Sequence, residues 1–474
     1  MKSLLASMLV PVLLFLCLFS PASAEGEEWL VSGDFTYRVQ ADGTAVLTGY
    51  TGKKEDLVIP ARLNGMTVTA IGAEAFKGKT ALMTVTLPET IIEIGDYAFF
   101  RCENLTHINL PAGIREIGRN PFASCSLDCL DLAPGHPSLA LEDGVLYSLP
   151  DQRLVACSVS RPKGAFTVPA GIRIIGASAF YECKTLTGLT LPDTVTSIGK
   201  KAFYQCSLLK AINLPDSISY LGDGAFNGCS SLRSLTCPDT VTEIGTSAFE
   251  DCVSLEELIL PEGATSIGDR AFFNCSSLTS VELPEDITSI GQNTFAECKN
   301  LRRIVLPDEV TYIGGGAFLN CYALSEINIP EDVSYIGTGA FYKCTSLEEL
   351  ELPDDCFYIG SAAFLGCTSL KRLTLPGMLN AVNAEAFAGC AFEELELPSR
   401  ITSIGDRAFL GCVSLTAIEI PGRVTSIGEQ AFYGCRSLKE VILPDSLTDV
   451  ASSAFDQCIA LENLPDLSGL SGPD

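Results

Sequence analysis

Cysteine is the residue type in this sequence that could support the most chemistry, because thiolates form disulfides, bind zinc and act as nucleophiles. The 474 residues include 20 cysteines, and most of them lie three residues after a recurring phenylalanine. This spacing gives each the same inward position in successive repeats, where a free thiol packs as a small apolar side chain. Zinc is not favoured, since no Cys-x-x-Cys motif occurs and ligands 23 residues apart form a row. The recurring positions are Cys102, Cys125, Cys183, Cys206, Cys229, Cys252, Cys275, Cys298, Cys321, Cys344, Cys367, Cys390, Cys412, Cys435 and Cys458.

The cysteines outside this row leave one redox question open. Cys17 lies in an N-terminal segment that we expect to be removed, which leaves 19 of the 20 cysteines, an odd number. At least one thiol of a monomer must then stay unpaired. Cys129 and Cys157 flank or lie in an interruption of the repeats. They are the best candidates for a disulfide, although both could equally remain free.

The residues that most catalytic sites need are scarce. His107 and His136 are the only histidines, so a Ser-His-Asp triad or a histidine-rich metal site has little material. No glycine motif for phosphates or dinucleotides occurs, and the carboxylates fall at repeat positions without the spacing of a catalytic pair. The sequence therefore predicts a protein that is not an enzyme and needs no cofactor.

Charge and targeting signals narrow the class of partner. With 31 Lys and Arg against 58 Asp and Glu, the formal net charge is −27, which repels nucleic acids and anionic membranes. Lys2, an apolar run from Leu4 to Leu18 and Ala22-Ser23-Ala24 are typical of a signal peptide cleaved near Ala24. No later stretch has the roughly 20 apolar residues of a membrane-spanning helix. We therefore expect a secreted or cell-surface protein that does not span the membrane.

The elements that position these residues repeat with a period of 23 residues. An Ile-Gly pair or a degraded form of it recurs 16 times, each time followed by a phenylalanine five residues after the isoleucine position. A unit of this size cannot bury its own apolar side chains, so the units must stack and share main-chain hydrogen bonds. The pattern predicts a solenoid of 16 coils, with phenylalanines at positions 76, 99, 122, 180, 203, 226, 249, 272, 295, 318, 341, 364, 387, 409, 432 and 455.

One unit shows which elements to expect. Apolar residues alternate with polar ones at the end of 209–214, which is typical of a strand with one buried face. Pro215 ends the strand because it has no N–H to donate. Gly199 permits a sharp change of direction, and 199–206 has room for one or two helical turns. We expect an α/β-type repeat solenoid, mostly β with short helical turns.

The repeated pattern Leu-Pro-x-x-Val-x-x-Ile-Gly-x-x-Ala-Phe-x-x-Cys-x-x-Leu resembles the BspA-type (Treponema pallidum-type) leucine-rich repeat family over about residues 30–460. The segment 35–60 is similar to the family's N-terminal β-hairpin cap, with a turn signal at Asp42-Gly43. Residues 143–147 resemble a hairpin that protrudes from the stack in that family. The expected domains are a signal peptide (1–24), a β cap (25–65), repeats (66–134), a hairpin insertion (135–168), repeats (169–460) and a C-terminal tail (461–474).

Two rows of exposed side chains are candidates for binding. Acidic residues follow the repeat proline in eight consecutive coils, at positions 193, 216, 239, 262, 285, 308, 331 and 354. They could recruit Ca²⁺ through their oxygens, or they are solvated turn residues. Tyr312, Tyr335 and Tyr358 precede the inward isoleucine of three successive coils. They could grip a protein or a sugar, or shield one another and stabilise the sheet.

The outward positions of the main strand form a third candidate surface. Glu282, Arg302, Arg303, Glu349 and Glu351 vary between coils whose core residues stay constant, as expected of a recognition surface and equally of an unconstrained one. The resemblance implies adhesion or protein binding outside the cell. We therefore expect a non-catalytic protein that binds an extracellular protein of a host or matrix. A glycan-binding module that uses the tyrosines and a structural spacer are the alternatives.

Overall fold

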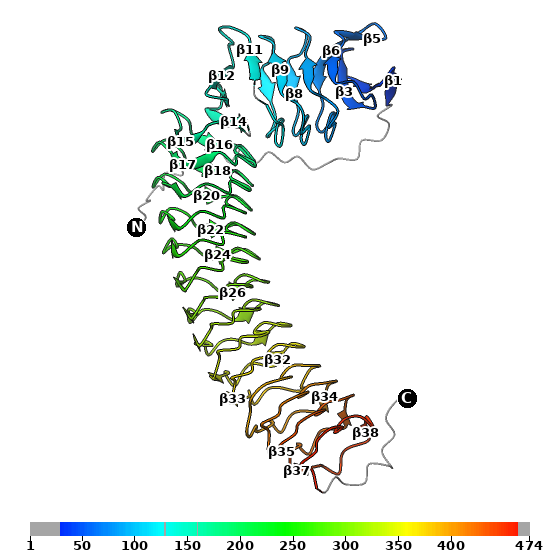
Figure 1. Cartoon of the computed structure of the whole chain (residues 1–474), viewed down its shortest axis with the longest axis vertical. Coiled ribbons are helices and arrows are strands. Elements are labelled where there is room, and N and C mark those ends of the chain that lie inside the picture. Colours follow the sequence, from blue (N-terminus) through cyan, green and yellow to red (C-terminus); the bar gives the residue numbers. More distant parts are fainter. Residues whose placement is uncertain (1–28, 128, 159, 463–474) are drawn as a thin grey trace, which may run out of the picture.

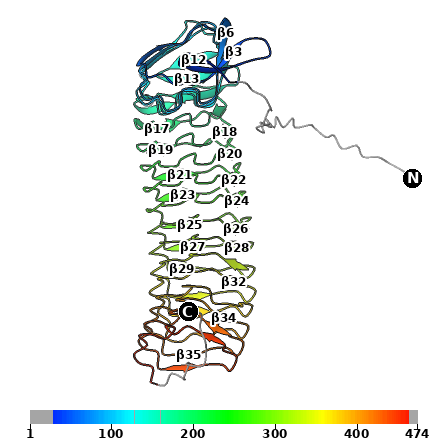
Figure 2. The same cartoon turned by 90° about the vertical axis from the view of Figure 1, so that its right-hand side faces the viewer.

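The computed structural model describes residues 29–127, 129–158 and 160–462, and these residues form one stack of coils that bends along its length (Figure 1). Most regular coils contribute two short strands, which pair in parallel with the equivalent strands of a neighbouring coil, often on both sides. The predicted repeat solenoid with a β-hairpin cap is confirmed. Figure 2 shows the two sets of strands as separate columns along the stack.

Four strands belong to the cap: β1 (Leu30–Ser32), β2 (Phe35–Val39), β3 (Ala45–Tyr50) and β5 (Arg62–Leu63). We call the set that carries the repeat isoleucine the isoleucine column. It comprises β6 (Met66–Ile71), β8 (Glu93–Ile94), β10 (Glu116–Ile117), β16 (Ile174–Ile175), β18 (Ser197–Ile198), β20 (Tyr220–Leu221), β22 (Glu243–Ile244), β24 (Ser266–Ile267), β26 (Ser289–Ile290), β28 (Tyr312–Ile313), β30 (Tyr335–Ile336), β32 (Tyr358–Ile359), β34 (Ser403–Ile404), β36 (Ser426–Ile427) and β38 (Asp449–Val450).

We call the other set the leucine column. It comprises β4 (Asp56–Val58), β7 (Thr84–Thr86), β9 (His107–Leu110), β11 (Cys129–Leu132), β15 (Gly164–Thr167), β17 (Leu186–Thr190), β19 (Ala211–Ile212), β21 (Ser234–Thr236), β23 (Glu257–Ile259), β25 (Ser280–Glu282), β27 (Arg303–Val305), β29 (Glu326–Ile327), β31 (Glu349–Glu351), β33 (Arg372–Thr374), β35 (Ala417–Glu419) and β37 (Glu440–Ile442). Three more strands, β12 (Leu139–Glu142), β13 (Val145–Ser148) and β14 (Arg153–Cys157), lie in the insertion.

The core of the stack is a column of phenylalanine rings. Each repeat phenylalanine is buried, and neighbouring rings stack nearly parallel with centroids 5.0–5.8 Å apart. Alanine, isoleucine, leucine and cysteine side chains of the same coils fill the space around the rings. The core therefore runs along the axis as two clusters that meet at the insertion, and each coil depends on its neighbours for burial.

The predicted helical turns are wrong, since the described residues contain no helix. Between Gly199 and Cys206 the backbone N–H groups alternate in direction. Phe203 and Gln205 donate to carbonyls of the next coil at 2.8 and 2.7 Å, whereas Tyr204 donates to the carbonyl three residues earlier in its own coil. Lys201 and Gln205 take positive φ values of 55° and 57°. A helix would direct every N–H along its own axis, so this segment forms tight turns instead.

The expected hairpin is present as β12 and β13, but instead of protruding it pairs with β14 and is built into the stack. Strands β12, β13 and β14 pair antiparallel, and β14 then pairs in parallel with β16, with Leu154 opposite Ile175. Leu47 of β3 likewise lies opposite Ile71 of β6. These two segments lack the Ile-Gly motif yet each contributes a coil, which explains why the solenoid has about 18 turns where the motif count predicted 16.

The stack changes direction at the insertion (Figure 1). On the side of the isoleucine column, β14 lies between the coils of β10 and β16. The Arg153 guanidinium donates a hydrogen bond to the Ile117 carbonyl at 2.8 Å. At the turns that carry the repeat phenylalanines, the insertion supplies no ring between Phe122 and Phe180. The Asn120 side-chain amide there donates a hydrogen bond directly to the carbonyl of Ser178. The insertion therefore acts as a wedge that separates the coils on one side only.

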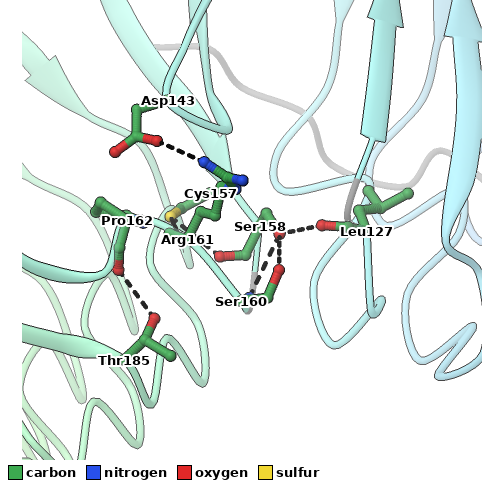
Figure 3. Close-up of polar contacts among 8 residues, drawn as sticks. All are labelled: Leu127, Asp143, Cys157, Ser158, Ser160, Arg161, Pro162 and Thr185. Atoms are coloured by element: carbon green, nitrogen blue, oxygen red, sulfur yellow. Dashed lines mark hydrogen bonds and ion pairs between the residues drawn. The ribbon is translucent and has the colours of Figure 1, made fainter.

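Side chains hold the wedge in place (Figure 3). The Ser158 hydroxyl donates to the Leu127 carbonyl of the preceding coils, and the Thr185 hydroxyl of the following coil donates to the Pro162 carbonyl at 2.9 Å. Arg161 and Asp143 form an ion pair within the insertion at 3.2 Å. On the side of the following coil these contacts add to the backbone hydrogen bonds of β14 with β16 and of β15 with β17.

All 19 cysteines among the described residues are free thiols. Fourteen of the fifteen in the repeat row donate their S–H to a repeat phenylalanine carbonyl in the previous coil, as Cys206 does to Phe180 at 3.0 Å. Cys183 uses Ser158 in place of the missing phenylalanine. The candidate disulfide does not form, because Cys129 is exposed on β11 whereas Cys157 is buried and donates to the Arg161 carbonyl.

We expect a maleimide at pH 8 to label the native protein at Cys129 only. Burial raises the pKa of Cys206 well above its usual range and that of Cys237 to about 12, so these thiols are neither ionised nor accessible. Mass spectrometry of peptides from the native protein checks the site, and labelling in urea should reach the other cysteines. Native Cys129→Ser should stay unlabelled. Labelling of its repeat-row cysteines before unfolding would contradict the buried row.

Candidate partner-binding surfaces

The three predicted tyrosines form a stack on the isoleucine column. Tyr312 and Tyr335 have ring centroids 4.9 Å apart, and Tyr335 and Tyr358 are separated by 4.7 Å, with interplanar angles of 12° and 10°. Parallel pairing of β28, β30 and β32 places them directly beside one another. Burial by its two neighbours raises the pKa of Tyr335. The ring faces therefore cover one another, and mainly their edges and hydroxyls are available to a partner.

The outward side of the leucine column carries the other predicted residues. Glu282 of β25 and Arg303 of β27 line one hollow of about 780 Å³, together with Val305 and the acidic turn residues Asp308 and Glu309. Arg302 is exposed immediately before β27, and its carbonyl joins the hydrogen bonds between coils. The hollow is thus formed by two adjacent strands and the turns that follow them.

Glu349 and Glu351 of β31 line a second hollow of about 450 Å³, beside Asn328, Arg372 and Thr374. Arg372 forms an ion pair with Glu349. Arg372 was not among the predicted residues, although it lies 23 residues after Glu349 and the repeat spacing alone would have found it.

A third hollow of about 330 Å³ continues the same face toward the C-terminal end. Glu394, Glu396, Glu419, Glu440 and Ile442 line it. None of these residues was predicted, although Glu396, Glu419 and Ile442 lie 23 residues apart and the repeat spacing would have placed them in one row. The predicted set therefore separates into two surfaces, a tyrosine stack on the isoleucine column and a hollowed, glutamate-rich face on the leucine column. Figure 2 shows the two strand columns that carry them.

The remaining polar candidates have structural environments. His107 is exposed on β9, whereas His136 is buried and its Nδ1 accepts the N–H groups of Ser138 and Leu139. The acidic row lies in turns, where the Asp239 carboxylate accepts the Glu262 N–H at 3.4 Å. Within the described ranges, no group of three or more His, Cys, Asp or Glu side chains is arranged to hold a metal ion.

The family is decided by a match of the repeats to a family model. The model described as the BspA type leucine rich repeat region matches residues 66–139, 163–278, 231–347, 265–391 and 334–462, which together cover most of the chain. The chain belongs to the BspA-type leucine-rich repeat family. The predicted resemblance to this family is thereby confirmed.

Solved structures of bacterial leucine-rich repeat proteins are similar to this BspA-type chain. A protein from Bacteroides ovatus is 26% identical, with 91% of this chain and 93% of the other covered and a TM-score of 0.46. A leucine rich cell surface protein from Faecalibacterium prausnitzii is 25% identical, with 95% and 99% covered and a TM-score of 0.39. The T. pallidum leucine rich repeat protein is 27% identical, with 53% and 91% covered and a TM-score of 0.26.

A search of curated proteins finds no match to this BspA-type chain. Of the residues that the structure describes, none belongs to a helix long and apolar enough to cross a bilayer. The predicted signal peptide (1–24) and most of the predicted tail (461–474) lie outside the described residues.

Proposed function

We propose that this protein acts outside the cell, secreted or held at its surface, and binds another extracellular protein without catalysis. The observation that carries the proposal is the contrast between the two sides of the leucine column. The inward residues repeat almost without change and are buried, whereas the outward residues change from coil to coil and line three hollows. A rigid backbone with variable outward side chains is suited to recognition of an extended protein surface.

Membership of the BspA-type family supports binding as the function, because leucine-rich repeat domains generally bind proteins. The predicted signal peptide supports the extracellular location. The scarcity of histidine and the absence of nucleotide-binding motifs in the sequence support a role without chemistry.

Glycan binding through the tyrosines is the second candidate. Sugars usually pack against exposed aromatic faces, but the faces of Tyr335 are covered by Tyr312 and Tyr358. A glycan would have to bind through the row of hydroxyl groups and the ring edges, which offers less contact area than a free ring. The stack is therefore better suited to stabilising the sheet, and we favour the leucine column as the binding surface.

A binding comparison of two variants tests this choice. The purified chain is first applied to a panel of extracellular matrix proteins and a glycan array. We expect Glu282→Ala/Val305→Ser/Glu351→Ala to weaken binding to a protein ligand at least about tenfold, since a few central residues dominate an interface. Tyr312→Ala/Tyr335→Ala/Tyr358→Ala should change it less than about threefold. Surface plasmon resonance measures both, and circular dichroism checks that both variants are folded.

The opposite pattern would refute the proposal. Ligands that are only glycans, with binding lost in the tyrosine variant and kept in the leucine-column variant, would establish the second candidate. Protein binding that neither variant alters would place the binding surface elsewhere.

A further inference from the structure

Charge is distributed unevenly along the outward side of the leucine column. Two residues of each coil flank the inward apolar residue and point outward, as Glu257 and Ile259 flank Leu258. From Thr84 to Thr236 these flanking positions carry one acidic residue, Asp131, and no Lys or Arg. From Glu257 to Ile442 they carry two arginines, Arg303 and Arg372, and nine glutamates, namely Glu257, Glu282, Glu326, Glu349, Glu351, Glu394, Glu396, Glu419 and Glu440.

Few of these glutamates have a cation beside them. Arg303 lies 3.6 Å from Glu326, and Arg372 pairs with Glu349. The other seven form no ion pair with any residue that the structure describes, and all nine are exposed. The face from β23 to β37, which we call the acidic face, therefore has unbalanced negative charge.

The acidic face is also hollowed and partly apolar. Its three hollows lie in consecutive segments along the column and have volumes of about 780, 450 and 330 Å³. Ile259, Val305 and Ile442 are 61%, 52% and 50% exposed on this face. Val305 and Ile442 line two of the hollows, where they offer apolar contact area to side chains of a partner.

We infer that the acidic face binds a cationic segment of another protein, with Lys or Arg side chains against the glutamates and aliphatic side chains in the hollows. This inference rests on the proposed function and specifies its partner. Charge complementarity selects the occupant, because opposite charges steer the encounter and like charges oppose it. A second copy of the chain, with a net charge of −27, is disfavoured, and so are nucleic acids and anionic lipids.

The terminal segments of the chain do not supply this occupant either. Residues 1–28 contain Lys2 but also Glu25, Glu27 and Glu28, and residues 463–474 contain two aspartates and no Lys or Arg. Neither segment has the positive charge that the acidic face would attract. Nine coils at about 4.8 Å span about 38 Å, which a segment of about 12 extended residues matches at about 3.3 Å each.

A designed peptide is the probe. Three copies of Lys-Ser-Leu-Ser give 12 residues whose lysines and leucines share one side of an extended chain, and fluorescence anisotropy measures binding of this peptide to the full chain. We expect saturable binding that is at least about tenfold tighter than for the same peptide with glutamate in place of lysine. Replacing leucine by serine should weaken binding about threefold or more, since the hollows then lose their apolar contacts.

Two charge-reversal variants identify the surface. Glu282→Lys/Glu351→Lys/Glu396→Lys should weaken peptide binding at least about tenfold. The control Glu89→Lys/Asp193→Lys/Asp216→Lys changes the net charge equally but alters exposed turn residues of coils that precede the acidic face, and it should weaken binding less than about threefold. Equal losses in the two variants, or no saturable binding by the wild-type chain, would overturn the inference.

The proposed function can stand when this inference fails. A natural protein ligand whose binding is lost in Glu282→Ala/Val305→Ser/Glu351→Ala, but which the lysine peptide does not displace, would support the leucine column as the binding surface and refute a cationic partner. Ligand binding that is indifferent to that variant would refute the proposed function itself, whatever the peptide does.

Discussion

Phe249→Ala should destabilise the protein by about 3–5 kcal/mol, among the largest losses that a single substitution in this chain can cause. The Phe249 ring is fully buried and stacks on Phe226 at 5.5 Å and on Phe272 at 5.7 Å. Its removal leaves a cavity in the middle of the column, and the backbone cannot collapse into it because hydrogen bonds to both neighbouring coils fix the spacing. Urea unfolding followed by circular dichroism measures the loss.

Two other phenylalanines serve as controls. Phe357 is 52% exposed, so Phe357→Ala should change stability by less than about 0.5 kcal/mol. Phe455 has one ring neighbour, Phe432 at 5.2 Å, and Phe455→Ala should cost clearly less than Phe249→Ala. If all three variants unfold at the same urea concentration, the stacked column is not what holds the coils together.

Gly222→Ala is expected to cost about 3 kcal/mol or more, although it adds a single methyl group. A Cβ at this position would lie 2.4 Å from the Lys200 nitrogen and 2.6 Å from the Gly199 carbonyl carbon. Both atoms belong to the backbone of the preceding coil, so no side chain can move aside. The N–H of Gly222 also donates to the Ile198 carbonyl at 2.9 Å, and separating the coils to admit the methyl group would strain such bonds.

Gly422→Ala is the matched control for this prediction. No atom lies within 4 Å of a Cβ there, and its φ is not in the left-handed region. This substitution should be neutral or slightly stabilising, because alanine restricts the unfolded chain more than glycine does. Calorimetric melting of both variants makes the comparison. A neutral Gly222→Ala would show that the coils can separate at little cost.

The sequence predicts the core well because burial here follows from position in the repeat. Phe203, Ile198 and Cys206 recur at fixed spacing, and stacking brings each beside its equivalent in the next coil. The same reasoning placed Tyr312, Tyr335 and Tyr358 side by side. In this solenoid two residues that are 23 positions apart lie beside one another in adjacent coils. Contacts between coils can therefore be predicted from the spacing alone.

The predictions that were wrong concern features that the repeat pattern does not encode. The apolar spacing of Ala202, Phe203 and Cys206 fits a helix as well as a series of turns, and the choice depends on hydrogen bonds to the next coil. Leu47 and Leu154 occupy coils without the Ile-Gly motif, so their partners became apparent only from strand pairing. On the acidic face, Glu396 and Glu419 were within reach of the repeat spacing, but the hollow that they line became apparent only from the structure.

Because of the wedge at residues 135–168, the length of each arm and the direction of the longer arm depend on different parts of the chain. The number of regular coils fixes how far each arm extends, since every coil adds the same increment along its axis. The direction in which the longer arm points depends on one irregular coil, held by contacts such as Arg153 to Ile117 and Ser158 to Leu127. Gain or loss of whole repeats would therefore alter reach while leaving the elbow angle of the molecule unchanged.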